Sequence, residues 1–179
     1  MRYRYCPRCG GQLEARIAGD DGEVPYCLTC ERFWFDAFST CVIVLIVNDR
    51  GEVLLLRQDY LSREHATIVS GYMKPGETAE QAARREVREE VGLGLSSLRY
   101  GGSCWFASGD MLMIGFVAQA EPGELRLSDE VNAAQWVEPE RAAKLVVPET
   151  PGSPVHMLLR LQSRWASERA AEGMEADSP

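Results

Sequence analysis

Long apolar runs are missing from this sequence of 179 residues. None approaches the ~20 consecutive apolar residues that a membrane-spanning helix requires, so we expect no transmembrane segment. Basic residues are in the minority, with 19 Lys and Arg against 27 Asp and Glu and a formal charge of −8. This balance argues against broad affinity for nucleic acids or anionic membranes, but it is compatible with one polyanionic ligand held through a metal ion. The polar, cysteine-bearing start is not typical of a secretory signal, and we expect a cytoplasmic protein.

Four of the six cysteines form two C-x-x-C pairs near the N-terminus. The pairs are Cys6 with Cys9 and Cys27 with Cys30. Such a spacing indicates a tetrahedral structural zinc site, a zinc ribbon. The alternatives are two disulfides, which a cytoplasmic location disfavours, or a redox pair, which needs only one C-x-x-C beside a βαβ unit.

We therefore predict a zinc ribbon over residues 1–36, with strands at 13–17 and 24–26. So small a unit buries too little apolar surface to fold alone, and the metal would supply the missing stability. This unit contains five arginines and six acidic residues, so its net charge is close to zero. It lacks the excess of positive charge that binds nucleic-acid phosphates, and we expect a structural or dimer-building role instead.

The rest of the chain mixes strand and helix patterns. The expected strands are 40–47, 53–57, 98–106, 111–120 and a run ending near 136, and the expected helices beyond residue 138 are 139–145 and 155–168. This mixture predicts an α/β fold, an α/β/α sandwich with a mixed sheet. We expect this domain to span 37–169, followed by a disordered tail over 170–179.

The most informative stretch is 71–93, a glycine-punctuated loop that leads into a helix. Thr78 is the predicted N-cap, with Gln81 completing a capping box, and Gly92 and Gly94 are predicted to end the helix.

Three carboxylates project from one face of this helix, because Glu86, Glu89 and Glu90 are spaced at i, i+3 and i+4. Like charges at this spacing repel one another, and a hard divalent cation would relieve the repulsion. The other face is apolar and is predicted to pack on a sheet. The alternative is a solvated helix whose glutamates pair with its own arginines.

The spacing of the whole stretch resembles the Nudix box, G-x(5)-E-x(7)-R-E-U-x-E-E-x-G-U, in which U is a bulky aliphatic residue. Its positions are filled by Gly71, Glu77, Arg85, Glu86, Val87, Glu89, Glu90, Gly92 and Leu93. Nudix hydrolases use Mg²⁺ or Mn²⁺ to cleave a nucleoside diphosphate linked to another group, and the resemblance implies the same reaction here. Metal ions suit it because they neutralise the diphosphate, orient it and acidify the attacking water.

The resemblance also implies roles for single residues. Glu86 and Glu90 would bind the metal, and Glu89 would bind metal or help to activate water. Arg85 would pair with Glu77 and brace the loop on the helix. The backbone carbonyl of Gly71 would also reach a metal ion.

A zinc ribbon directly before a Nudix domain resembles the NADH pyrophosphatase branch of the family. The implied substrate is a dinucleotide such as NADH, NAD, FAD or ADP-ribose, and a homodimer is implied as well. In that branch a glutamate several residues before a tryptophan joins the metal site, which implies Glu130, six residues before Trp136, with Asp129 as the alternative. The implied substrate contacts are Tyr72, by base stacking, Phe35 and Trp105.

One departure concerns the branch signature S-Q-P-W-P-F-P-x-S. The corresponding stretch, 102–108, keeps the first serine, the tryptophan, the phenylalanine and the last serine, but lacks the glutamine and the prolines. This supports the pyrophosphatase reaction better than a preference for NADH. Alternatives are another Nudix substrate (a nucleotide sugar, a modified nucleoside triphosphate or a capped RNA end) or a non-catalytic nucleotide sensor.

Overall fold

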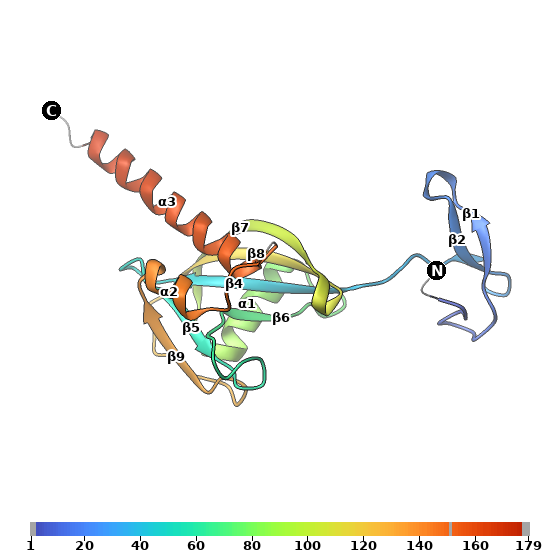
Figure 1. The fold of residues 1–179 in the computed structure, drawn as a ribbon, viewed down its shortest axis with the longest axis horizontal. Helices are drawn as coiled ribbons and strands as arrows, with labels where there is room; N and C mark the ends of the chain where they lie inside the picture. The colour runs from blue at the N-terminus through green and yellow to red at the C-terminus, as the bar shows by residue number, and fades with distance from the viewer. Residues whose placement is uncertain (1–2, 151, 177–179) are drawn as a thin grey trace. The chain divides into compact units, whose positions relative to one another are not determined.

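The computed structural model describes residues 3–150 and 152–176. The chain divides into two compact units, Met1–Phe38 and Ser39–Pro179, and each is described by itself (Figure 1). Among the described residues, no helix combines the length and the apolar character needed to cross a bilayer.

The N-terminal unit is a three-stranded antiparallel sheet in the order β1-β2-β3. Its strands are β1 (Glu14–Ile17), β2 (Glu23–Cys27) and β3 (Arg32–Phe33). Its apolar interior is small: one cluster of buried residues comprises Cys6, Leu13 and Cys27, and Val24 is buried as well. So little burial leaves the folding of this unit dependent on other interactions.

A mixed sheet forms the centre of the C-terminal unit, with strand order β7-β8-β4-β5-β9 and β6 also paired with β4. The strands are β4 (Ser39–Val47), β5 (Val53–Arg57), β6 (Val69–Tyr72), β7 (Leu95–Phe106), β8 (Met111–Ala120) and β9 (Ala133–Val137). β4 and β8 run parallel, and the other pairs are antiparallel. One edge of β4 pairs with β6 along 41–44 and with β5 only near Val47, so the sheet divides between β5 and β6.

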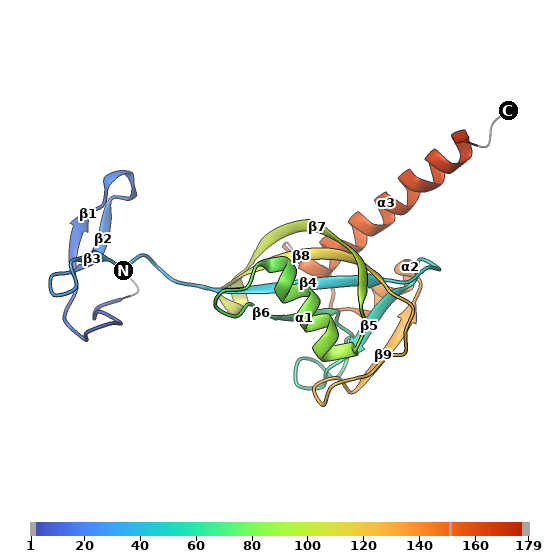
Figure 2. The same ribbon diagram turned by 180° about the vertical axis from the view of Figure 1, so that it is seen from behind.

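Helices cover both faces of this sheet (Figures 1 and 2). They are α1 (Ala79–Val91), α2 (Pro139–Leu145) and α3 (Pro154–Ala176). A hydrophobic core lies on each face of the sheet, and alternate residues of β4 contribute to one or the other. Ile43 and Leu45 pack with α2 and α3, whereas Val42 and Val44 pack with α1. Burial of each such side chain stabilises the fold by about 1.5–3 kcal/mol, which explains the continuously apolar sequence of this strand. The predicted α/β/α sandwich is confirmed.

The predicted boundaries of α1 are confirmed. The Thr78 hydroxyl accepts from the Gln81 N–H, the Gln81 side chain accepts from the Thr78 N–H, and Gly92 ends the helix in the left-handed conformation.

The last helix is longer than expected, because α3 continues to Ala176 instead of ending near Glu168. Residues 169–176 include several alanines and glutamates and no proline, and their one glycine, Gly173, disfavours a helix by only about 1 kcal/mol, so a helix that has already formed can continue through them. Most of the expected disordered tail, 170–179, therefore belongs to α3, and 177–179 lie outside the described residues. The boundary expected at residue 36 stays a prediction.

Candidate functional site

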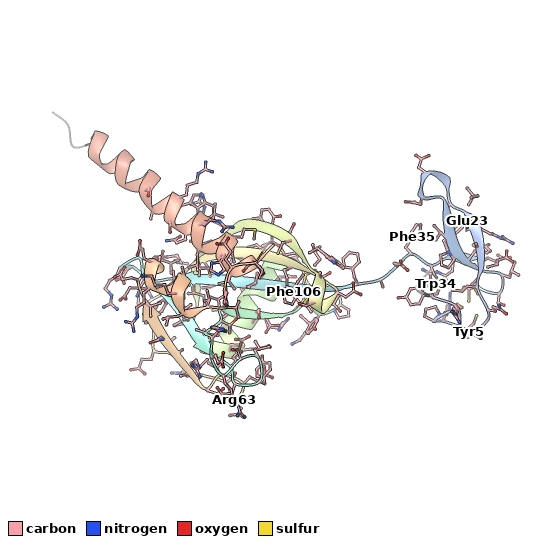
Figure 3. The ribbon with its side chains drawn as sticks, viewed as in Figure 1. Tyr5, Glu23, Trp34, Phe35, Arg63 and Phe106 are labelled. Atoms are coloured by element: carbon pink, nitrogen blue, oxygen red, sulfur yellow. The ribbon has the colours of Figure 1, made fainter. Side chains whose placement is uncertain are left out.

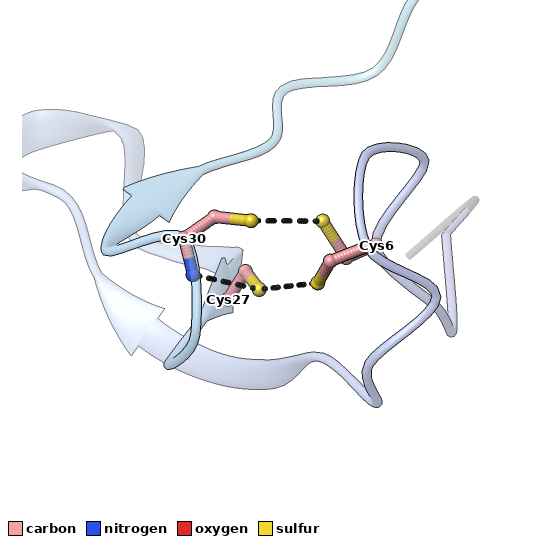
Figure 4. Close-up of side chains that lie close together, drawn as sticks. Cys6, Cys27 and Cys30 are labelled. Atoms are coloured by element: carbon pink, nitrogen blue, oxygen red, sulfur yellow. Dashed lines mark hydrogen bonds between the residues drawn. The ribbon is translucent and has the colours of Figure 1, made fainter.

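The four paired cysteines converge in the N-terminal unit (Figure 4). The Sγ atoms of Cys6 and Cys30 lie 3.9 Å apart, those of Cys9 and Cys27 lie 3.5 Å apart, and all four fall within 4.8 Å of one another. A tetrahedral Zn²⁺ with Zn–S bonds of ~2.3 Å separates its sulfur ligands by ~3.8 Å. All four are free thiols, so the disulfide alternative is wrong. The cluster suggests a zinc site.

The thiols of this cluster differ in acidity. Burial opposes ionisation of Cys6, but backbone N–H groups of Cys9 and Arg8 outweigh it and lower the pKa of Cys6 to about 6. Hydrogen bonding with Cys9, together with burial, raises the pKa of Cys30 to about 12. Because zinc binds thiolates, filling the site would release protons, and its affinity would rise with pH.

The second cluster is carried by α1 in the C-terminal unit, where Arg85 joins the helix to the preceding loop. Its Nε lies 2.6 Å from Glu77 Oε1 and its Nη2 lies 2.9 Å from Glu77 Oε2, so the expected ion pair is present and bidentate. Arg85 also donates to the Tyr72 carbonyl, and the Lys74 N–H donates to Glu77. Arg85 and then the Lys74 N–H hold the pKa of Glu77 at about 2. The loop between β6 and α1 is thereby fixed to the helix.

Glu86 lies directly against the backbone of β6 at Gly71. A Cβ atom built on Gly71 would lie 2.1 Å from the carboxyl carbon of Glu86, a distance that no side chain could adopt without moving one of the two. The glycine therefore allows the carboxylate to reach the strand.

Glu90 is the buried member of the cluster, with 5% of its surface exposed. Burial, then the negative charges of Glu86 and Glu130, raise the pKa of Glu90 to about 8, although hydrogen bonds from the Ser70 N–H and the Gln58 amide oppose the rise. The distance from Gln58 Nε2 to Glu90 Oε2 is 3.1 Å. Among the described residues, no Lys or Arg forms an ion pair with Glu90, whereas Arg85 pairs with Glu77, Glu86 and Glu89.

Glu130 reaches this cluster from a turn after β8. The Ser128 N–H donates to the Glu90 carbonyl at 3.0 Å, and the Val131 N–H donates to the Ser128 carbonyl at 3.1 Å. Asp129 lies in the same turn and also lines the cleft, and the charge of Glu130 is among those that raise the pKa of Glu90.

Glu89 has different surroundings. Its side chain is 52% exposed and lies 3.0 Å from Arg85 Nη1 and 3.5 Å from Lys74 Nζ. Arg85 also contacts Glu86 at 2.5 Å. The alternative of glutamates paired with the arginines of their own helix thus applies to Glu86 and Glu89 but not to Glu90, for which no ion pair occurs within the described residues.

A cleft with a volume of about 1150 Å³ lies beside the carboxylates. Glu86, Glu89, Glu90 and Glu130 line one part of it. Tyr72 and Trp105 also line it and are 59% and 47% exposed. Phe35 belongs to the N-terminal unit, and its expected contact with the substrate stays a prediction (Figure 3).

Several lining residues were not foreseen from the sequence. Tyr60 follows β5, and partial burial followed by the charges of Glu90, Glu130 and Glu86 raises its pKa. Cys41, Met111 and Met113 form an apolar part of the wall, with Cys41 Sγ 3.4 Å from Met111 Sδ. Strand alternation could have placed these three on one face, but only the pairing of β4 with β8 brings them together.

The carboxylate cluster fits a hard divalent cation. Glu86, Glu90 and Glu130 offer oxygen donors from two segments of the chain, and no basic side chain in the described part of the structure pairs with Glu90. Oxygen ligands and an accessible cleft are what Mg²⁺ and Mn²⁺ require, since both ions retain open positions for water and phosphate.

Comparison with known proteins identifies the family of this chain. The model of the NUDIX domain matches residues 38–156. Among curated proteins, the chain is 36% identical over 136 residues to the "NAD-capped RNA hydrolase NudC" of Pseudomonas fluorescens, covering 75% of this chain and 48% of that protein. It is 35% identical over 140 residues to the "NAD-capped RNA hydrolase ndx-9" of Caenorhabditis elegans, covering 75% of this chain and 36% of that protein. The chain thus spans about half the length, or less, of these relatives.

Solved structures agree on the fold. A NUDIX hydrolase from Nitrosomonas europaea superposes with a TM-score of 0.69 at 18% identity, covering 90% of this chain and 91% of that chain. A C. elegans Ap4A hydrolase in a binary complex gives a TM-score of 0.59 at 26% identity, covering 72% of this chain and 98% of that chain.

Proposed function

The chain belongs to the Nudix family and is related to the NudC proteins, and from this premise we propose that it is a metal-dependent pyrophosphohydrolase of dinucleotides. The proposed substrate contains a diphosphate that joins a nucleoside to a second group, as in NADH, NAD, FAD or ADP-ribose. Hydrolysis releases a mononucleotide, so NADH gives AMP and reduced nicotinamide mononucleotide.

One observation carries this proposal. Glu86, Glu90 and Glu130, from two segments far apart in the sequence, face a single cleft with room for a nucleotide. A carboxylate as buried and uncompensated as Glu90 costs stability unless it has a ligand, and a divalent cation between it and a diphosphate supplies one.

We assign the following roles to single residues of the cleft. Glu86, Glu90 and Glu130, with the Gly71 carbonyl, are the proposed ligands of Mg²⁺ or Mn²⁺, which when bound would neutralise the diphosphate and acidify a water. Glu89 is more exposed and either joins the metal or accepts a proton from the attacking water. Its ion pairs with Lys74 and Arg85 hold it at the cleft.

Substrate recognition is assigned to the aromatic part of the cleft. Tyr72 is proposed to stack on a base, an interaction worth ~1–3 kcal/mol that tolerates several bases. Trp105 is proposed as a second contact. Phe35 is kept as a proposal on the family resemblance alone.

The second candidate substrate is an NAD-capped RNA end. The names of the relatives support it, because they are NAD-capped RNA hydrolases. The same diphosphate bond would be cleaved, with the RNA chain extending from the adenosine.

For the N-terminal unit we propose structural Zn²⁺ held by Cys6, Cys9, Cys27 and Cys30. We also propose a homodimer, which light scattering after size-exclusion chromatography would test.

A substrate panel tests the function. The purified protein is incubated with Mg²⁺ or Mn²⁺ and NADH, NAD, FAD, ADP-ribose, diadenosine polyphosphates, UDP-sugars or NAD-capped RNA. Product monophosphates are converted to phosphate with a coupled phosphatase. Clear turnover of a dinucleotide supports the proposal, and exclusive turnover of the capped RNA supports the second candidate. Metal binding without turnover of any substrate favours a nucleotide sensor.

A further inference from the structure

Gln58 is a polar side chain in a buried position. It follows the last residue of β5 and is only 1% exposed, although its neighbours in the chain, Arg57 and Asp59, are not buried. Its backbone carbonyl accepts hydrogen bonds from the N–H groups of Leu61 and Ser62, at 2.9 and 3.1 Å. The backbone is therefore fixed at the start of the loop that carries Tyr60 into the cleft.

The side chain of Gln58 makes one hydrogen bond, to the buried Glu90. Its Nε2 donates to Glu90 Oε2 at 3.1 Å, while the Ser70 N–H also donates to the Glu90 carboxylate. The carboxylate is thus held from β5 and from β6, and the negative charges of Glu86 and Glu130 act on it as well.

The carbonyl oxygen of the same amide lowers the stability of the fold. Gln58 Oε1 is buried and has no hydrogen-bond partner among the residues that the structure describes. Leaving a buried acceptor unsatisfied destabilises a protein by about 1–3 kcal/mol, and an apolar side chain of similar shape would avoid this. Stability alone therefore does not account for a glutamine here.

An uncharged donor suits a carboxylate that must bind a cation. Arg85 shows the contrast, because its guanidinium contacts Glu86 and Glu89 and supplies the positive charge itself. At Gln58 an amide can orient Glu90 without neutralising it.

From this geometry we propose that Gln58 is a positioning residue, which holds the Glu90 carboxylate in the orientation that binds the divalent cation. The inference rests on the proposed function in one respect, since it takes Glu90 to be a ligand of that cation. Partners that orient a ligand in this way typically change metal affinity or activity by 10–100-fold when removed.

The test replaces the amide by an apolar side chain of similar length, in Gln58→Met. The matched control is Gln162→Met, because Gln162 is also buried (4% exposed) but lies on α3, whereas the amide that contacts Glu90 is that of Gln58. Binding of Mn²⁺ to the metal-free proteins is followed by electron paramagnetic resonance without substrate. Turnover of the best dinucleotide is followed against the Mg²⁺ concentration, and thermal unfolding is recorded without metal.

For Gln58→Met we expect Mn²⁺ affinity about tenfold weaker or more, a matching rise in the Mg²⁺ concentration for half-maximal rate, and a lower kcat. The KM for the dinucleotide at saturating Mg²⁺ should change little. The melting temperature without metal should change little, because loss of the hydrogen bond to Glu90 offsets removal of the unpaired Oε1, and the control should keep wild-type Mn²⁺ affinity.

Wild-type Mn²⁺ affinity in Gln58→Met overturns the inference, as does an equal loss in the control. Should Gln58→Met not fold, Gln58→Leu takes its place, and if neither folds the amide is structural and the inference is wrong. A wild-type protein that binds Mn²⁺ but cleaves nothing in the panel refutes the proposed function alone, because the difference in Mn²⁺ affinity still decides the role of Gln58. A wild-type protein that binds no divalent cation refutes both.

Discussion

The two ligand clusters of this chain are built in opposite ways. In the N-terminal unit four sulfurs lie within 4.8 Å of one another and leave no position open. In the C-terminal unit the carboxylates are distributed along the wall of a cleft, and two of them contact Arg85. A closed tetrahedral set is typical of a structural metal, whereas an accessible set of oxygens leaves room for water and substrate. The comparison therefore predicts that the first cluster controls folding and the second controls turnover.

The largest expected effect is on turnover, from Glu90→Gln. It removes the charge of a proposed metal ligand, and we expect kcat to fall by about two to three orders of magnitude, a loss of ~3–4 kcal/mol of transition-state stabilisation. Stability without metal should not fall, because the buried charge is removed as well. Steady-state kinetics and thermal unfolding measure both. Near-full activity would refute the assignment of Glu90.

For Cys27→Ser we expect the opposite pattern, a loss of folding in the N-terminal unit. Loss of one of four sulfurs should reduce bound zinc from about one ion per chain to nearly none and unfold the N-terminal unit. Zinc content and the fluorescence of Trp34, which packs against the small core of that unit, report on this. Cys104→Ser is the control, since Cys104 lies outside the cluster. Zinc retained in Cys27→Ser would show that the cluster is not the zinc site.

A smaller effect should follow from Gly71→Ala. The new Cβ would collide with the Glu86 carboxyl group at 2.1 Å and displace either β6 or the carboxylate, so kcat should fall about 10–100-fold. Gly123→Ala is the control, because a Cβ there would lie 3.6 Å from its nearest neighbour. Equal activity of the two variants would mean that the position of Glu86 is unimportant.

The smallest expected effect is on stability as a function of pH. The pKa of Glu90 rises from 4.5 to about 8 on folding, so the folded state holds this proton more tightly than the unfolded chain. Its contribution is complete below about pH 4.5 and is lost as the pH rises toward 8. Without metal, the free energy of unfolding should therefore decrease between pH 5.5 and 8, on the order of 2 kcal/mol.

Urea unfolding of the C-terminal unit in EDTA measures this decrease. Glu90→Gln should reduce it, and Mg²⁺ should offset it at pH 8 because the cation stabilises the carboxylate. An equally steep profile in the variant would assign the pH dependence to another group. Glu77 acts in the opposite direction and outside this window, since its pKa is lowered to about 2 and its contribution is lost only in acid.

Local sequence signals account for much of this structure. The capping box at Thr78, the end of α1 at Gly92 and the cysteine pairs are set by residues close together in the chain, and each was predicted. Glu130 was placed beside the metal site only through the family resemblance, because no local pattern joins it to α1. Its position depends on backbone hydrogen bonds between distant segments, such as the one from the Ser128 N–H to the Glu90 carbonyl.

Contacts between distant segments could not be predicted. That Gln58 points at Glu90 depends on how β5 lies against α1, and the approach of Gly71 to Glu86 depends on the pairing of β6 with β4. The length of α3 was missed for another reason: the apolar periodicity of its sequence ends before the helix does, so the sequence pattern predicts only its first part.

The backbone hydrogen bonds that hold the Glu130 turn have a consequence for divergence within such folds. Arg126 N–H donates to the Val91 carbonyl and Ser128 N–H to the Glu90 carbonyl, so the turn is anchored to the end of α1 and not to the end of β8. The exposed residues 122–124 before these anchors can therefore change in number without moving Glu130. Insertions at this loop would therefore add new surface to the fold while preserving the position of Glu130, a proposed metal ligand.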